Sequence, residues 1–114
     1  MDSDRIHLIH INECLGRIAK YVEGGRGAFM GSTQVQDAVM WNLAIMSRSA
    51  RLLSDVQKRG HPEVDWSGLC HVWRNFAHDP TGADPDEVWQ EVERTIPALR
   101  QQMMSILVAV RKGV

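Results

Sequence analysis

The chain has 114 residues, of which 44% are hydrophobic and 24% are charged, and its formal net charge is −1. This length is enough for one hydrophobic core, so we expect a single globular domain over residues 1–114. The near-zero charge excludes a general electrostatic attraction to nucleic acid. Any contact with RNA must therefore come from a local basic patch.

The N-terminus and the two cysteines predict a cytoplasmic protein. Met1 to Arg5 is polar and acidic, unlike a signal peptide. No apolar run approaches the roughly 20 residues of a membrane-spanning helix, so no membrane contact is expected. Cys14 and Cys70 form no paired motif, and both thiols are expected to be reduced.

Apolar residues recur at helical spacing near the start of the chain and predict a helix with one buried face. Ser3 is its expected cap, and Gly24-Gly25 is its expected end. Residues 24–31 should form a glycine-rich loop that Phe29 pins to the core. The buried stripe consists of Leu8, Ile11, Leu15, Ile18 and Val22.

A second long helix is expected from Thr33 to Gly60. Thr33 and Gln36 have the spacing of a capping box, in which each side chain satisfies the first turn. Gly60-His61-Pro62 should stop the helix. Its expected stripe consists of Val35, Val39, Leu43, Met46, Ala50, Leu53 and Val56.

Two further helices are predicted. A short one should begin after Asp65, which can accept from its first amides, and end near His78 before Pro80. A long one should begin with Asp84 as cap and Pro85 at the first helical position. Its stripe consists of Val88, Val92, Ile96, Leu99, Met103, Ile106 and Val110.

No alternating strand pattern occurs, so the sequence predicts an all-α, up-and-down bundle of three long helices and one short one. Pro97 lies inside the last stripe and predicts a kink. The long stripes could also bury a dimer interface. Aromatic residues are enriched at interfaces, which favours an interface role for at least one tryptophan; alternatively, all four complete the monomer core. They are Trp41, Trp66, Trp73 and Trp89.

Arg74, Asn75 and His78 form a short motif with the chemistry of RNA cleavage. Histidine can move protons near neutral pH, and arginine can hold phosphate oxygens with its planar donors. Asn75 can orient either group. Taken alone, the pair also fits a structural role, in which Arg74 pairs with Asp79 and His78 ends a helix.

The order and separation of five segments resemble the HepT-like family of HEPN-domain toxins, over almost the whole chain. The resemblance implies an all-helical dimer that cleaves RNA without a metal ion. It also implies an MntA-like nucleotidyltransferase antitoxin as partner. The segments are Gln36 to Leu43, Ala50 to Ser54, His61 to Trp66, Arg74 to His78, and Gly82 to Trp89.

The resemblance assigns Arg74 to the motif arginine, Asn75 to the polar residue after it, and His78 to the motif histidine. In the family, two such sets meet across the dimer cleft. The chain has three residues between arginine and histidine, where the family has four to six. Pro80 replaces the tyrosine that the antitoxin AMPylates, which leaves Thr81 as the candidate for modification.

Arg48 and Arg51 are the candidate RNA contacts, close in sequence to Lys58 and Arg59 but interrupted by Asp55. Taken alone, these charges are better explained as a solvated helix face. Relatives often carry Gly-Glu at the positions of residues 47 and 48, so an acidic group is missing here.

One other cluster could bind a metal ion. His7 and His10 lie three residues apart, and Asp4 precedes them by one turn. The second Glu-x-x-His arrangement of a di-metal bundle is absent, so a polar helix flank is favoured. We expect neither a metal ion nor another cofactor.

Two functions remain for the structure to address. The first is the toxin of a toxin–antitoxin pair, a metal-independent endoribonuclease that uses His78 and Arg74 and is neutralised by its nucleotidyltransferase antitoxin. The alternative is a catalytically degenerate HEPN-fold module that holds a nucleotidyltransferase or an RNA without cleaving it.

Overall fold

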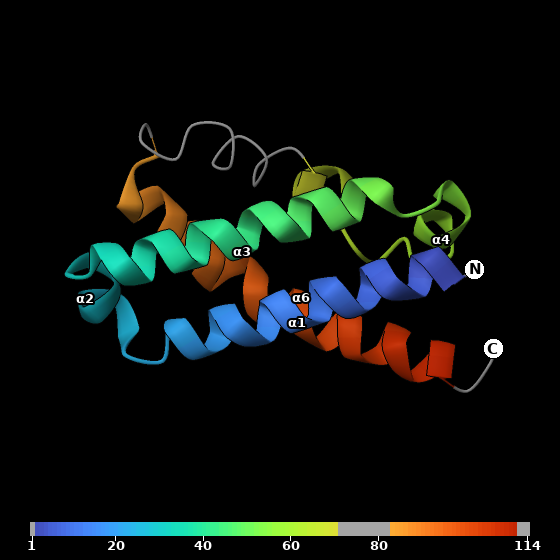
Figure 1. The fold of residues 1–114 in the computed structure, drawn as a ribbon, viewed down its shortest axis with the longest axis horizontal. Coiled ribbons are helices and arrows are strands. Elements are labelled where there is room, and N and C mark those ends of the chain that lie inside the picture. The colour runs from blue at the N-terminus through green and yellow to red at the C-terminus, as the bar shows by residue number, and fades with distance from the viewer. Residues whose placement is uncertain (1, 71–82, 112–114) are drawn as a thin grey trace.

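The computed structural model describes residues 2–70 and 83–111, and the described residues form an all-α bundle without strands (Figure 1). This confirms the predicted fold class and the three long helices, while the short helices are more numerous than predicted. The long helices are α1 (Asp2–Tyr21), α3 (Thr33–Leu52) and α6 (Pro85–Arg111). The short ones are α2 (Gly25–Met30), α4 (Asp55–Arg59) and the helical residues 66–70.

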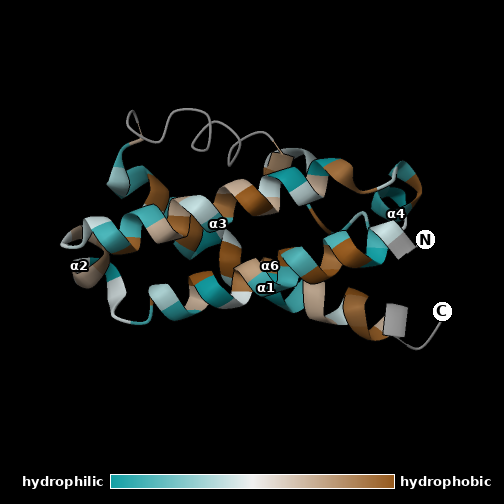
Figure 2. Ribbon diagram, viewed as in Figure 1, coloured by the Kyte–Doolittle hydropathy of each residue, from teal (hydrophilic) through white to brown (hydrophobic). Residues whose placement is uncertain are grey.

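Helix α1 lies at the centre of the packing. It contacts α3 along one side and α6 along another, and α2 contacts both α3 and α6 at one end of the bundle. Apolar and polar residues alternate along each long helix (Figure 2), and buried apolar residues from all three helices belong to one core. The predicted stripes therefore form one core, with Val56 as the exception, while the side chain of Val110 lies outside the description. Among the described residues, no helix has both the length and the apolar character needed to cross a membrane.

Residues 25–30 form helix α2 where the glycines predicted a loop. Gly25 has a φ of 85°, a left-handed conformation that suits glycine and turns the chain out of α1. Phe29 is buried, and its ring centroid lies 5.3 Å from that of Trp89. Burial of this aromatic pair offsets the low helix propensity of the glycines. The prediction that Phe29 pins the segment to the core is confirmed.

Helix α3 is capped by Ser32, not by the predicted pair of Thr33 and Gln36. The Ser32 hydroxyl accepts a hydrogen bond from the Val35 amide at 3.1 Å. Gln36 lies one residue too far along to complete a capping box. Its side-chain amide instead donates to the Phe29 carbonyl at 2.9 Å, which satisfies the end of α2.

The predicted second helix is broken near its end. Helix α3 ends at Leu52, and Ser54 caps the separate helix α4 by accepting from the Gln57 amide at 3.1 Å. Ser54 is extended, with φ −68° and ψ 155°, so it cannot continue the helix. As a result, Val56 does not lie on the buried stripe and is 72% exposed.

Asp4 binds the start of α1 to this break. Its carboxylate accepts from the Ser54 backbone amide at 2.9 Å and from the Ser54 hydroxyl at 2.6 Å, and the residue is only 6% exposed. The hydrogen bond from the Ser54 side chain lowers the pKa of Asp4, although burial opposes it. Because α1 begins at Asp2, Ser3 lies within the helix and is not its cap, contrary to our prediction.

The start of α6 agrees with the prediction. Asp84 accepts from the Asp86 amide at 3.0 Å, and Pro85 is the first helical residue. The helix continues through Pro97 to Arg111.

The tryptophans divide between the core and the surface. Trp66 and Trp89 are buried in the core of the single chain, whereas Trp41 on α3 is 68% exposed. Trp73 lies outside the described residues. An interface role for a tryptophan therefore stays a prediction.

Replacing Asp4 by Asn should lower the free energy of unfolding at pH 7 by about 1–3 kcal/mol, because the charged acceptor for both Ser54 donors is lost. The pKa of Asp4 is lowered in the folded protein. The ionised carboxylate of Asp4 therefore adds to the free energy of unfolding at pH values above its ordinary pKa of about 4. This contribution is lost as the pH falls through the lowered pKa that Asp4 has in the folded protein. Urea unfolding at pH 7 and pH 3 measures both effects.

The stability difference between Asp4→Asn and the wild type should narrow at pH 3. Asp37→Asn makes the same chemical change at an exposed position of α3 and should have little effect at either pH. A difference for Asp4→Asn that stays constant with pH would contradict the role of its ionised carboxylate.

Candidate functional site

The predicted Arg–His motif lies outside the described residues. This applies to Arg74, Asn75 and His78, and also to Thr81. The structure describes the residues on either side of the segment 71–82, and these determine where the chain enters and leaves it.

The chain enters the segment from helical residues 66–70, which are well fixed at their start. Asp65 accepts from the Gly68 amide at 2.9 Å, which confirms the predicted cap. A Cβ atom on Gly68 would lie 2.1 Å from an Asp65 carboxylate oxygen, so a larger residue there would require the Asp65 side chain to shift. The Trp66 indole donates to the His61 carbonyl at 3.0 Å, while Trp66 and Leu69 are buried. Burial and capping together hold this helix start in one place.

Both long helices on either side bind the chain ahead of the segment. The buried Ser47 hydroxyl on α3 donates to the Cys70 carbonyl at 3.3 Å. From the other side, the Gln102 amide on α6 donates to the Glu63 carbonyl at 3.1 Å. Since Cys70 is four residues before Arg74, these contacts fix the chain just ahead of the motif.

The chain leaves the segment at Ala83, again beside α3. Ala83 and Met40 pack against the core and line the same small cavity of about 40 Å³. Met40 and Ser47 are seven residues apart on α3, roughly 10 Å at 1.5 Å per residue. Both ends of the segment that carries the motif are therefore fixed next to α3, about two helical turns apart.

Arg48 and Arg51, the predicted RNA contacts, are exposed on the C-terminal half of α3. Within residues 2–70 and 83–111, neither takes part in an ion pair. Arg48 directly follows Ser47 and so lies beside the entry to the motif segment. Lys58 and Arg59 belong to the separate helix α4. The structure thus places Arg48 beside the entry to the motif segment, and contact of Arg48 and Arg51 with RNA stays a prediction.

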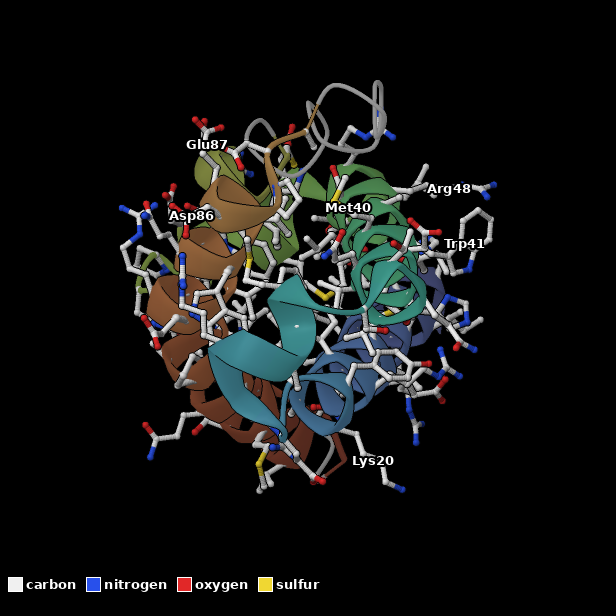
Figure 3. All side chains as sticks on the ribbon, turned by 90° about the vertical axis from the view of Figure 1, so that its left-hand side faces the viewer. Lys20, Met40, Trp41, Arg48, Asp86 and Glu87 are labelled. Atoms are coloured by element: carbon white, nitrogen blue, oxygen red, sulfur yellow. The ribbon has the colours of Figure 1, made fainter. Side chains whose placement is uncertain are left out.

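Acidic residues gather on the opposite side of the molecule. Asp86 and Glu87 project from the start of α6, on the side away from Arg48 (Figure 3). Asp86 pairs with Arg26 of α2, and Glu91 pairs with Arg94 in the next turns of α6. Because Arg26 and Arg94 offset Asp86 and Glu91, the contrast between the two sides depends, among the described residues, on Arg48 and Arg51 of α3 and on Glu87 of α6.

The remaining reactive groups have structural surroundings. Both carboxylate oxygens of Asp4 already accept from Ser54, and the rings of His7 and His10 lie 6.4 Å apart. Burial raises the pKa of the Cys14 thiol, which disfavours the thiolate that a nucleophile needs. Among the described residues, no group of three or more histidine, cysteine or acidic side chains could hold a metal ion.

Ser47→Ala should lower the free energy of unfolding by about 1 kcal/mol, because the Cys70 carbonyl loses its side-chain donor. The loss should also speed amide hydrogen exchange in residues 66–70, measured by mass spectrometry. Ser49→Ala is the matched control, since Ser49 is also a buried serine of α3. Equal acceleration of exchange by both substitutions would contradict a specific role of Ser47 in holding this helix.

Comparison with known proteins gives two matches in sequence. The model of a family described as "Ribonuclease HepT-like" matches residues 11–106. A protein named "Probable ribonuclease HepT" from Thermococcus cleftensis is 28% identical over 72 residues. That match covers 63% of this chain and 66% of the relative, which is just under two thirds of its length. No solved structure matches the chain significantly.

Proposed function

This chain belongs to the HepT-like ribonuclease family, and on that premise we propose that it is a toxin that cleaves RNA through Arg74 and His78. The observation that carries the proposal is the family match, which extends over residues 11–106. It includes both the motif and the two ends at which α3 holds the segment around it. Support from the structure is indirect: a fixed scaffold on either side, with exposed cations beside it.

The proposed reaction is attack of the RNA 2′-oxygen on the adjacent phosphorus. The bond from phosphorus to the 5′-oxygen breaks, leaving a 2′,3′-cyclic phosphate and a free 5′-hydroxyl. His78 takes the proton from the 2′-hydroxyl or supplies one to the leaving oxygen, since its ordinary pKa of about 6.5 keeps both forms populated. Arg74 stabilises the charge that develops on the phosphate oxygens, and Asn75 orients the reacting groups.

The proposal includes a homodimer in which two motifs share one cleft. Two histidines would then serve one phosphate, one as base and one as acid. Ile6 on α1 and Met104 and Val108 on α6 expose large apolar side chains that could be buried in such an interface.

The proposed partner is an MntA-like nucleotidyltransferase antitoxin. It would neutralise the toxin by covering the site or by transferring AMP to it. Thr81 supplies the hydroxyl nearest in sequence to the motif histidine on its C-terminal side.

The purified protein should cleave end-labelled RNA in the presence of excess chelator, because histidine and arginine supply the chemistry without a metal ion. Arg74→Ala and His78→Ala should each reduce the rate at least about 100-fold, as expected for loss of proton transfer or charge stabilisation. Denaturing gel electrophoresis measures the rates.

His10→Ala serves as control, because His10 is an exposed histidine of α1 far from the motif in sequence. It should cleave like the wild type. Absence of cleavage by the wild-type protein across several RNAs would reject the nuclease and favour a binding module that has kept the fold without the catalysis.

Incubation with ATP and the nucleotidyltransferase partner should add AMP to the wild-type protein, and Thr81→Ala should prevent this. The measurement is intact mass followed by peptide mapping. Tyr21→Phe is the control, because Tyr21 is the only tyrosine of the chain and is exposed on α1. AMP on Tyr21, or unchanged addition to Thr81→Ala, would contradict Thr81 as the modified residue.

A further inference from the structure

The outer face of α3 carries an exposed tryptophan and an exposed arginine two helical turns apart. Trp41 and Arg48 are both exposed, and their side chains leave the same side of the helix (Figure 3). Met40 points instead toward the α6 side, next to the end of the motif segment. We call the surface of Trp41 and Arg48 the α3 outer face.

The spacing of these two side chains suits an extended chain of nucleotides. Residues seven apart on a helix share one face and are separated by roughly 10 Å along the axis. Ala44 and Ile45 lie on the turn between them and are only partly exposed, and Ile45 packs against the core. Trp41 and Arg48 are the exposed side chains of this stretch of the face. An aromatic ring and a cation therefore lie in line, separated by the length of about one or two unstacked nucleotides.

We propose that the α3 outer face is a subsite for single-stranded RNA, in which Trp41 stacks on an unpaired base and Arg48 binds a neighbouring phosphate. This subsite rests on the proposed function, because it deepens the RNA specificity of the same protein. Every base has a face that can stack on tryptophan, so the subsite accepts RNA of any base sequence but requires its bases to be unpaired. The guanidinium of Arg48 can donate two parallel hydrogen bonds to a phosphate.

The subsite lies next to the entry of the motif segment. Arg48 follows Ser47, whose hydroxyl holds the Cys70 carbonyl, and Arg51 continues the cationic path one turn further along α3. A strand bound on the α3 outer face is thus close to the point from which the chain leads into Arg74. The subsite would select single-stranded regions and hold them beside the reacting groups.

A second copy of the chain is the competing occupant of this face. Stable interfaces between proteins are built around an apolar centre and bury about 800 Å² on each partner. Trp41 and Leu52 are the large hydrophobic side chains that α3 exposes, and Arg48 lies between them in sequence. Neither Arg48 nor Arg51 has an ion-pair partner among the described residues, so charge favours a polyanion.

Binding of two short, fluorescein-labelled 2′-O-methyl RNA oligomers tests the subsite. One carries uridines throughout, and the other has the same phosphates but lacks its central bases. The 2′-O-methyl group prevents cleavage through the 2′-hydroxyl, so fluorescence anisotropy reports binding alone. The wild-type protein should prefer the oligomer with bases.

Trp41→Ala should weaken binding of the complete oligomer about tenfold and abolish the preference, whereas Trp41→Tyr should retain most of both. Arg48→Gln should weaken both oligomers alike and reduce the salt dependence of log K by about 0.7. Val56→Ala removes an exposed apolar side chain from α4 and should change neither the affinity for the two oligomers nor the preference between them. Because Trp41 is exposed, Trp41→Ala should fold normally, which circular dichroism and the melting temperature check.

Two results would overturn the subsite. The first is an equal effect, or no effect, of Trp41→Ala on the two oligomers. The second is light scattering that shows a dimer for the wild type and a monomer for Trp41→Ala, which would assign the face to a second copy. If the protein prefers the oligomer with bases but cuts no RNA, the subsite is supported and the nuclease is rejected. If the protein cuts RNA but shows no such preference, the nuclease is supported and the subsite is rejected.

Discussion

The packing of α3 and α6 against α1 is the constraint on which the rest of the structure depends. The α1 stripe of Leu8, Ile11, Leu15 and Ile18 is fully buried between them. Each such side chain contributes roughly 1.5–3 kcal/mol, more than the roughly 1 kcal/mol of a typical cap or single hydrogen bond. Once this core fixes the positions of the long helices, short helices connect their ends. The positions of the short helices therefore depend on the packing of the long ones.

The same packing produces a scaffold for the site. Helix α3 holds the chain where it enters the motif segment, through Ser47, and where it leaves, beside Met40. Catalytic groups need positions that are fixed before the substrate arrives, and a segment bound at both ends to one rigid helix can meet that need. Exposed arginines lie on α3, and Asp86 and Glu87 at the start of α6 lie on the side away from Arg48. RNA approaching from the α3 side would meet Arg48, which lies next to the serine that binds the chain ahead of the motif segment.

Sequence patterns predicted the features that depend on many residues within one helix. They missed the features that depend on single contacts between residues far apart in the sequence. The three long helices were predictable because their stripes extend over many turns. Helix α2 was missed because its glycines predict a loop, while burial of Phe29 against Trp89 is a long-range effect. Likewise α3 ends early because Ser54 binds Asp4, far away in sequence. The bond from Ser47 to the helix that precedes the motif had no local signal either.

The measurement that tests the account most directly uses one RNA with a single 2′-deoxy substitution at a mapped cleavage site. If His78 and Arg74 promote attack by the 2′-oxygen, the all-ribose RNA should be cut there in excess chelator. It should yield a 2′,3′-cyclic phosphate, and the deoxy-substituted RNA should stay intact at that bond. Cleavage of the deoxy-substituted bond, or cleavage only after a divalent metal ion is added, would contradict the account.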